Sequence, residues 1–164
     1  MIRKATTQDI PAIRAMAQVV FRQTYRDILS PEQMDYMMDW MYSEASLLRQ
    51  MTDEGQTFLV EDGCGYVSFH PDGMTDDGIR LYHLEKLYVM PDCQNTGLGR
   101  RLFNQVVEYV RAQSSAPARI ELNVNRHNGA VTFYEHLGMF KSRSGDFPIG
   151  HGYFMNDYIM AIDL

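Results

Sequence analysis

The sequence has few of the features that mark specialised classes of protein. Its two cysteines, Cys64 and Cys93, lie far apart and share no metal-ligand or redox spacing with each other or with the five histidines. We therefore expect neither a disulfide scaffold nor a metal site. No apolar stretch is long enough to span a bilayer, and the N-terminus has no signal-peptide core. These absences favour a cytoplasmic protein without a membrane partner.

Positive charge is also scarce. The net charge is −6, and no block rich in lysine or arginine occurs. Such a field opposes non-specific binding of nucleic acid and favours cationic ligands, although moderate negative charge also serves solubility alone. Of the 164 residues, 45% are hydrophobic and 22% are charged. This balance predicts one globular domain over residues 1–164 with its own core.

Helical patterns dominate the first third of the chain after a short opening strand. Thr6 caps a predicted helix, and Ser30 caps a second helix in which Gln33 would close a capping box. Four methionines between positions 34 and 41 lie on the apolar face of the second helix. Core packing explains them better than a substrate groove does. Ser43 begins a third, shorter helix.

From residue 56 onward the pattern changes to strands. The segments TFLVE and YVSFH flank an Asp62-Gly63 hairpin turn, and Pro71-Asp72-Gly73 is expected to form a loop. The run IRLYHLEKLYV predicts a central strand whose odd-numbered side chains share one nominal face and whose even-numbered side chains share the other. A helix, a strand, a second helix and two strands follow. This order indicates a mixed α/β fold around one sheet.

A glycine-bearing turn in LYVMPDCQNTGLGRRLF joins the central strand to the next helix. Gln94, Gly97 and Gly99 stand at the spacing Q-x-x-G-x-G. Glycine lets backbone N–H groups approach phosphate oxygens, and the helix N-terminus adds a favourable potential. No Lys-Ser or Lys-Thr pair follows, and the third glycine of a dinucleotide fingerprint is absent. By itself this motif is equally consistent with a purely structural turn.

A second motif follows the glycine-bearing turn, and the two motifs together point to a ligand-binding role for that turn. The strand RIELNV leads to Asn125-Arg126-His127-Asn128 and then to GAVTFYEHLGMF. Over residues 79–143 the two motifs resemble the acetyl-coenzyme A-binding motifs of the GCN5-related N-acetyltransferase (GNAT) superfamily. The resemblance implies an α/β fold with a mixed, mostly antiparallel central sheet and helices on both faces. It also implies that the sheet splays between its fourth strand, 79–89, and its fifth, 119–124.

The resemblance implies acetyl-coenzyme A as co-substrate, held mainly by backbone amides, and no metal. Many relatives carry a basic residue where Asn95 and Thr96 stand, and Arg100 and Arg101 are candidates to replace that charge. The expected coenzyme-binding residues come from the end of the fourth strand, the turn and the second motif: Leu87, Tyr88, Val89, Gln94, Asn95, Thr96, Gly97, Leu98, Gly99, Arg100, Asn125, Asn128 and Tyr134.

Direct transfer requires an unprotonated amine, and an alkyl amine is almost fully protonated at neutral pH. Glu85, beside the expected splay, is the candidate general base acting through water, and many members of the family carry a glutamate on this strand. His83 is the rival, because a β-bulge would reverse the facing and parity alone does not choose. Tyr134 matches the family's general-acid tyrosine. A backbone amide near residues 87–89 would stabilise the oxyanion.

The tail FPIGHGYFMNDYIMAIDL is aromatic and nearly free of positive charge, and in the family this region helps to close the acceptor site. It resembles, less specifically, bacterial polyamine N-acetyltransferases, which favours a polyamine or another small cationic amine as the acceptor. Acetylation of a protein or peptide N-terminus or lysine is the alternative. A third alternative, a non-catalytic acyl-coenzyme A sensor, is disfavoured by the presence of both Glu85 and Tyr134. Dimers are common in the family, and the exposed aromatics leave a homodimer open.

Overall fold

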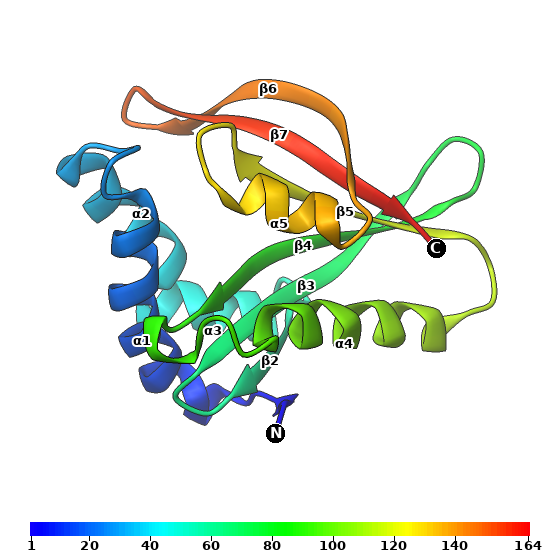
Figure 1. Cartoon of the computed structure of the whole chain (residues 1–164), viewed down its shortest axis with the longest axis horizontal. Coiled ribbons are helices and arrows are strands. Elements are labelled where there is room, and N and C mark those ends of the chain that lie inside the picture. The colour runs from blue at the N-terminus through cyan, green and yellow to red at the C-terminus, as the bar shows by residue number, and fades with distance from the viewer.

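A computed structural model describes all residues, 1–164. Its seven strands form one sheet in the order β1-β2-β3-β4-β5-β7-β6 (Figure 1). Neighbouring strands are antiparallel except for the parallel pair β4–β5. The sheet is therefore mixed and mostly antiparallel, as expected. The strands are β1 (Arg3–Lys4), β2 (Thr57–Glu61), β3 (Gly65–Met74), β4 (Arg80–Val89), β5 (Ala118–Asn125), β6 (Phe140–Gly150) and β7 (Tyr153–Asp163).

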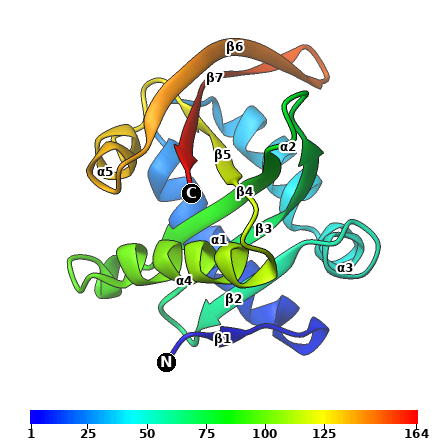
Figure 2. The ribbon, with the colours of Figure 1, turned by 90° about the vertical axis from the view of Figure 1, so that its right-hand side faces the viewer.

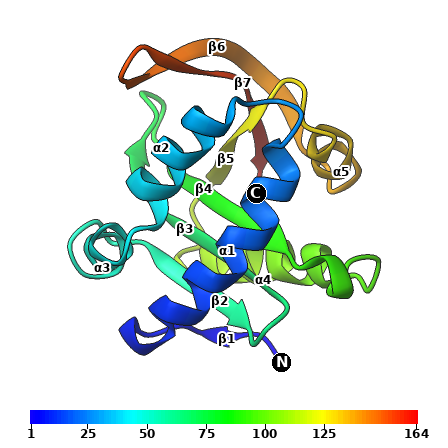
Figure 3. The same cartoon turned by 90° about the vertical axis from the view of Figure 1, so that its left-hand side faces the viewer.

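Helices cover both faces of the sheet, which confirms the predicted fold class. The first three pack on one face and the last two on the other, so that opposite side views bring α4 to the front in Figure 2 and α1 to the front in Figure 3. Each face has its own buried hydrophobic cluster. The helices are α1 (Ile10–Tyr25), α2 (Pro31–Tyr42), α3 (Glu44–Thr52), α4 (Leu98–Gln113) and α5 (Ala130–His136), with single 3-10 turns at Thr7–Asp9 and Pro91–Cys93.

The predicted caps of the second and third helices are confirmed, whereas Thr6 caps the 3-10 turn Thr7–Asp9 and α1 begins only at Ile10. The Ser30 hydroxyl accepts a hydrogen bond from the Gln33 amide, and the Ser43 hydroxyl accepts one from the Ser46 amide. The capping box was wrong, because the Gln33 side chain turns outward and donates to the Phe154 carbonyl at 3.0 Å. Gln33 thereby ties α2 to β7. The methionine stripe packs in the core as expected, with Met34, Met37 and Met38 buried.

The loop expected at Pro71-Asp72-Gly73 is instead part of β3, which continues to Met74. The strand β2 pairs with β3 only as far as Phe69, so Pro71 faces no neighbour on that side and its missing N–H removes no ladder bond there. The pairing with β4 is irregular between Pro71 and Met74, which accommodates the turn-forming residues inside a strand.

A β-bulge at Glu85 divides β4 into two halves. Ser68 of β3 pairs with Lys86 and the next residue, Phe69, pairs with Leu84, so Glu85 has no direct partner. The prediction that odd-numbered and even-numbered side chains keep to opposite faces along the whole strand was therefore wrong. An unpaired residue reverses which face each later side chain points to. Before the bulge, even-numbered Leu84 packs in the cluster under α4 and α5. After it, even-numbered Tyr88 packs with the cluster under α1, α2 and α3.

Beyond the bulge the sheet opens between β4 and β5. Their parallel pairing runs from Arg80↔Ala118 to Leu84↔Leu122 and stops there, although β4 continues to Val89 and β5 to Asn125. Figure 1 shows the two strands diverging toward their C-terminal ends. The expected splay is therefore present, and its edge strand β4 offers backbone groups that no neighbouring strand satisfies on the β5 side.

Candidate active site

A cavity of about 570 Å³ occupies the opening between β4 and β5. Side chains and backbone from α1, the second half of β4, the turn before α4, β5 and α5 line it. Such a volume is in the range of small-molecule and cofactor sites. Most of the predicted coenzyme-binding residues contribute to its wall: Leu87, Tyr88, Val89, Gln94, Asn95, Gly97, Leu98, Gly99, Arg100, Asn128 and Tyr134.

The turn before α4 presents a run of free amides. The N–H of Arg101 is the first in α4 to bond within the backbone, to the Gly97 carbonyl at 3.0 Å. The N–H groups of residues 95–100 donate to no backbone carbonyl. Gly97 has φ +80°, in the left-handed region that favours glycine, and Asn95 has φ +63°. These amides and the α4 N-terminus form an anion-binding concavity at one end of the cavity.

Three residues from the prediction do not line the cavity and have other hydrogen-bond or ion-pair partners. Thr96 donates its hydroxyl proton to the Cys93 carbonyl, and the Asn125 side chain accepts from the His127 amide in the turn after β5. The guanidinium of Arg101 pairs with Glu61 at 3.0 Å, whereas Arg100 lines the cavity. Of the two arginines, only Arg100 is placed to add positive charge near the free amides.

Cys64 and Cys93 form a disulfide, which the sequence analysis, expecting no disulfide scaffold, did not predict. They are 29 residues apart in sequence, with Cα atoms 5.6 Å apart. The register of β3 on β4 pairs Gly65 with Val89, which brings the β2–β3 turn next to the segment that follows β4. Sequence spacing carries no sign of this pairing, because the antiparallel sheet creates it. Cys93 also lines the cavity, so the disulfide braces the turn of free amides.

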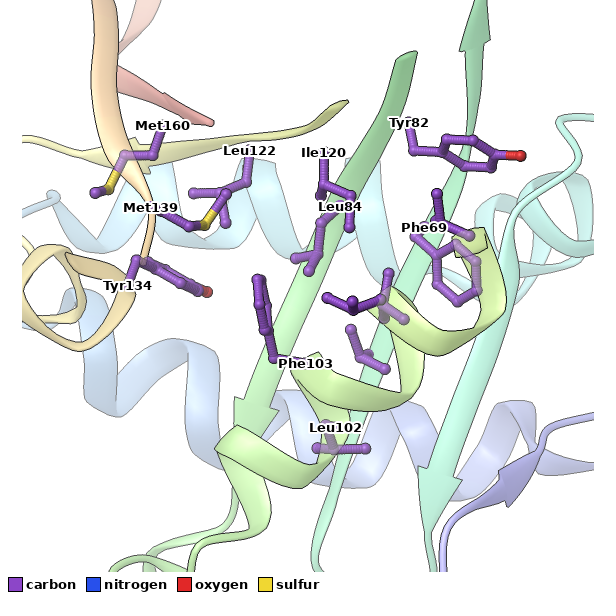
Figure 4. Close-up of a cluster of buried hydrophobic side chains, with 14 of the residues drawn as sticks. Phe69, Tyr82, Leu84, Leu102, Phe103, Ile120, Leu122, Tyr134, Met139 and Met160 are labelled. Carbon is purple, nitrogen blue, oxygen red and sulfur yellow. The ribbon is translucent and has the colours of Figure 1, made fainter. Parts of the chain in front are cut away.

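Tyr134 enters the cavity from α5. Its side chain is buried at 7% exposure, and Figure 4 shows the hydroxyl end directed toward the interior of the cluster that contains Phe103, Leu84 and Leu122. Burial raises the pKa of Tyr134 well above its ordinary value, so the phenol keeps its proton at neutral pH. A protonated phenol in this cavity can donate a hydrogen bond or a proton.

Glu85 lines the same cavity from the bulge of β4, and its side chain is 35% exposed. Its Oε1 lies 2.7 Å from Nε2 of His70, a residue of β3 that sequence reasoning did not select. Burial acts to raise the pKa of Glu85, but the hydrogen bond from His70 and the nearby positive charges offset it and leave that pKa below its ordinary value. His83, the rival base, does not line the cavity.

The comparisons agree with this geometry. The pattern of the acetyltransferase (GNAT) domain family matches residues 14–147, which is most of the chain. The chain belongs to the GNAT superfamily. An uncharacterized N-acetyltransferase of Lactobacillus delbrueckii subsp. lactis is 26% identical over 156 residues, covering 91% of this chain and 89% of the relative. The enzyme is thus an acetyl-coenzyme A-dependent N-acetyltransferase of the GNAT type.

Two solved structures show how widely the GNAT fold is shared. The PaiA N-acetyltransferase of Thermoplasma acidophilum in complex with coenzyme A has a TM-score of 0.72 and 19% identity, with coverage of 100% of this chain and 98% of that chain. The ribosomal-protein-S18-alanine N-acetyltransferase of Escherichia coli has a TM-score of 0.64 and 21% identity, with coverage of 99% and 92%. At these identities the likeness concerns the fold.

The residues present in this GNAT enzyme fit the coenzyme. Free amides at residues 95–100 suit a pyrophosphate, and the unpaired edge of β4 suits an amide-bearing pantetheine arm. No group of three or more His, Cys, Asp and Glu side chains converges so as to hold a metal ion. No helix combines the length and the apolar character that crossing a bilayer requires.

Sequence reasoning missed the contribution of α1 to the GNAT site. Val20, Gln23, Thr24 and Tyr25 line the cavity from the last turns of that helix. Val20 and Thr24 stand four residues apart and so share one face, which was the available signal, but nothing in the sequence says which cavity this face meets. Their helix lies on the sheet face opposite α5 and Tyr134.

A polar pair on β5 and β7 was also missed. Asn123 lines the cavity and donates to Oδ2 of Asp157 at 3.2 Å. Asp157 is fully buried, and its Oδ1 has no hydrogen-bond partner. Burial raises the pKa of Asp157 above its ordinary value. Asp157 does not itself line the cavity, so the pair meets the opening through Asn123.

The tail docks on α2. The Tyr36 hydroxyl donates to the Ile149 carbonyl at 2.6 Å, and the Tyr36 ring contacts His151 and Tyr153 with centroid separations of 4.7 and 5.4 Å. With the bond from Gln33 to Phe154, these contacts hold the tip of the β6–β7 hairpin against the helix (Figure 1). The tail is therefore packed against α2 and does not extend freely from the sheet.

Proposed function

We propose that this GNAT enzyme acetylates a small cationic amine such as a polyamine by direct transfer from acetyl-coenzyme A. The observation that carries the proposal is the position of Glu85, a carboxylate at the bulge where the sheet opens, in the same cavity as Tyr134. A carboxylate there attracts an ammonium group and can take its proton through water. The net charge of −6 also supports a cationic acceptor.

In the proposed reaction each group has one role. Backbone amides of residues 95–100 bind the pyrophosphate, and Arg100 adds positive charge beside them. The amine, freed of one proton, attacks the thioester carbonyl to form the C–N bond, and an amide near Leu87–Val89 stabilises the oxyanion. When the C–S bond breaks, Tyr134 supplies a proton to the thiolate of the coenzyme. The nitrogen then loses one of its two remaining protons and keeps the other in the amide product, and the lost proton restores the Tyr134 phenol through solvent.

Acetylation of a peptide N-terminus is the competing activity, since the Escherichia coli enzyme with the same fold is named for an alanine of ribosomal protein S18. The two acceptors make different demands. An α-amine has a pKa near 8 and is partly unprotonated at neutral pH, whereas an alkyl amine has a pKa of about 10.4 and depends far more on a base.

A panel of amines with acetyl-coenzyme A, followed by release of the coenzyme thiol, tests the proposal. We expect kcat/KM for spermidine and related polyamines to exceed that for N-terminal peptides and lysine peptides. Glu85→Gln should lower kcat/KM for alkyl amines by about a hundredfold, the size of a general-base contribution. A preference for peptides that survives Glu85→Gln would reject the polyamine assignment.

A further inference from the structure

Both ring nitrogens of His70 face hydrogen-bond acceptors. Nδ1 lies 2.9 Å from the carbonyl oxygen of Pro71, and Nε2 lies 2.7 Å from Oε1 of Glu85. A backbone carbonyl only accepts, and an ionised carboxylate only accepts, so each contact needs a proton. The Nδ1 proton is fixed by the carbonyl. The second proton therefore lies between Nε2 and Oε1, on one atom or the other.

The charges around His70 favour this shared proton. The hydrogen bond to Glu85 raises the pKa of His70, burial opposes that rise, and the Pro71 carbonyl and the charge of Asp72 add to it. From β4, His83 faces His70 with ring centroids 6.0 Å apart, and Lys86 lies one residue beyond Glu85. Lys86 is held by the Gln50 side chain under α3 rather than by Glu85.

We propose that His70 and Glu85 hold one proton jointly and must release it before turnover, so that the His70–Glu85 pair, not a lone carboxylate, accepts the proton of the incoming ammonium. This inference rests on the role of Glu85 in the proposed function. A lone carboxylate with a pKa near 4.3 is a weak base toward an alkylammonium. When a carboxylate and an imidazole hold one proton together, the pKa of the pair lies closer to the operating pH. A general base works best when its pKa is near that pH.

The proton balance of the step is simple. The resting pair carries one proton, and its loss to solvent leaves neutral His70 beside ionised Glu85. An ammonium substrate then gives one proton through water to Glu85, which shares it again with Nε2, and the neutral amine attacks the thioester. His70 acts through Glu85 and is a positioning residue. Its side chain is 20% exposed, which gives the proton a route to solvent.

Rate profiles against pH for wild type, His70→Gln and the matched control His83→Gln test the proposal. Glutamine at residue 70 still donates to Glu85 but takes up no proton. In wild type we expect kcat/KM for the amine to rise with an apparent pKa above about 6.5. His83→Gln should keep this rise. His70→Gln should lose it and lower kcat about tenfold or more, with KM for acetyl-coenzyme A unchanged. The titration of the amine is common to all three proteins and cancels in the comparison.

A titration of the His70 ring by NMR, in wild type and in Glu85→Gln, reads the shared proton without turnover. We expect the His70 pKa to lie above about 6.5 in wild type and to fall in the variant. The proposal is overturned if His70 titrates identically in both proteins, or if His70→Gln retains the wild-type profile. If wild type acetylates no amine while the NMR shift is present, the proposed function fails and the shared proton stands.

Discussion

Gly99 lies directly against the ring of Phe133: a β-carbon at residue 99 would stand 3.1 Å from Cζ of that ring. The contact joins the first turn of α4 to α5, and both elements line the cavity. Gly99→Ala should push them apart. We expect KM for acetyl-coenzyme A to rise severalfold and the free energy of unfolding to fall by about 1–2 kcal/mol, the usual cost of overpacking.

Gly129→Ala is the matched control for this substitution. Gly129 precedes α5 with φ −60°, and a β-carbon there would meet nothing within 4 Å. It should leave KM and stability nearly unchanged. Equal effects of the two alanines on KM would show that the contact with Phe133 does not set the width of the coenzyme site.

Removal of the Tyr134 hydroxyl should affect chemistry more than binding. Tyr134→Phe keeps the buried ring and takes away the proton that the thiolate would receive. We expect kcat to fall at least about tenfold with little change in the affinity for acetyl-coenzyme A. Steady-state rates and coenzyme binding by calorimetry measure the two effects separately. Tyr109→Phe, at a half-exposed position on α4, should have no effect on either. An unchanged kcat for Tyr134→Phe would remove the general-acid assignment.

Lys86 should make stability rise with pH. Burial lowers the pKa of Lys86 to about 8, whereas the unfolded chain holds the same proton to about 10.4. Between these values the unfolded state binds more protons, so raising the pH favours the folded state. We expect a gain of about 1.5 kcal/mol between about pH 8 and pH 9.5. Urea unfolding at a series of pH values measures it.

Lys86→Met has no ammonium to titrate and should show no such rise. We expect the rise in stability to stop below about pH 10, because above that pH the buried tyrosines make the free energy of unfolding fall. Burial raises the pKa of Tyr42 and Tyr66, so their protons are held more tightly in the folded state and stability falls once the unfolded tyrosines ionise. A wild-type profile as flat as that of Lys86→Met would indicate that Lys86 stays charged in the fold.

Reduction of the disulfide should weaken both the fold and the coenzyme site. The disulfide closes a loop across 29 residues, for which chain entropy predicts that reduction lowers the free energy of unfolding by about 3.5 kcal/mol. Because Cys93 borders the turn of free amides, we also expect KM for acetyl-coenzyme A to rise when a thiol reductant is added. Cys64→Ser with Cys93→Ser should reproduce both changes and be insensitive to reductant. An effect of reductant on this double variant would place its cause elsewhere.

Much of the fold could be predicted from the sequence because it depends on interactions between neighbouring residues. Ser30, Ser43 and the Asp62-Gly63 turn act through neighbouring residues, and the structure confirms each of them. The turn with Gly97 and Gly99 also lies within one short segment, so its free amides were predictable. Thirteen positions were expected from two such local motifs to bind the coenzyme, and all but Thr96 and Asn125 line the cavity.

The features that escaped prediction depend on contacts between distant segments. His70 and Glu85 meet across β3 and β4, and Cys64 meets Cys93 through the same pairing. Strand alternation gave the wrong facing for the second half of β4, because a bulge depends on the partner strand and not on its own residues. Gln33 had a local partner available, yet a tertiary acceptor at Phe154 displaced it.

The open edge of β4 has a consequence for how this enzyme can change over generations. Residues 85–89 present main-chain groups, which nearly every amino acid supplies equally, to the opening where we expect the pantetheine arm to bind. Substitutions along this stretch can therefore alter acceptor preference or packing while the acyl donor stays the same. Proline is the exception, because it alone brings no N–H to the edge.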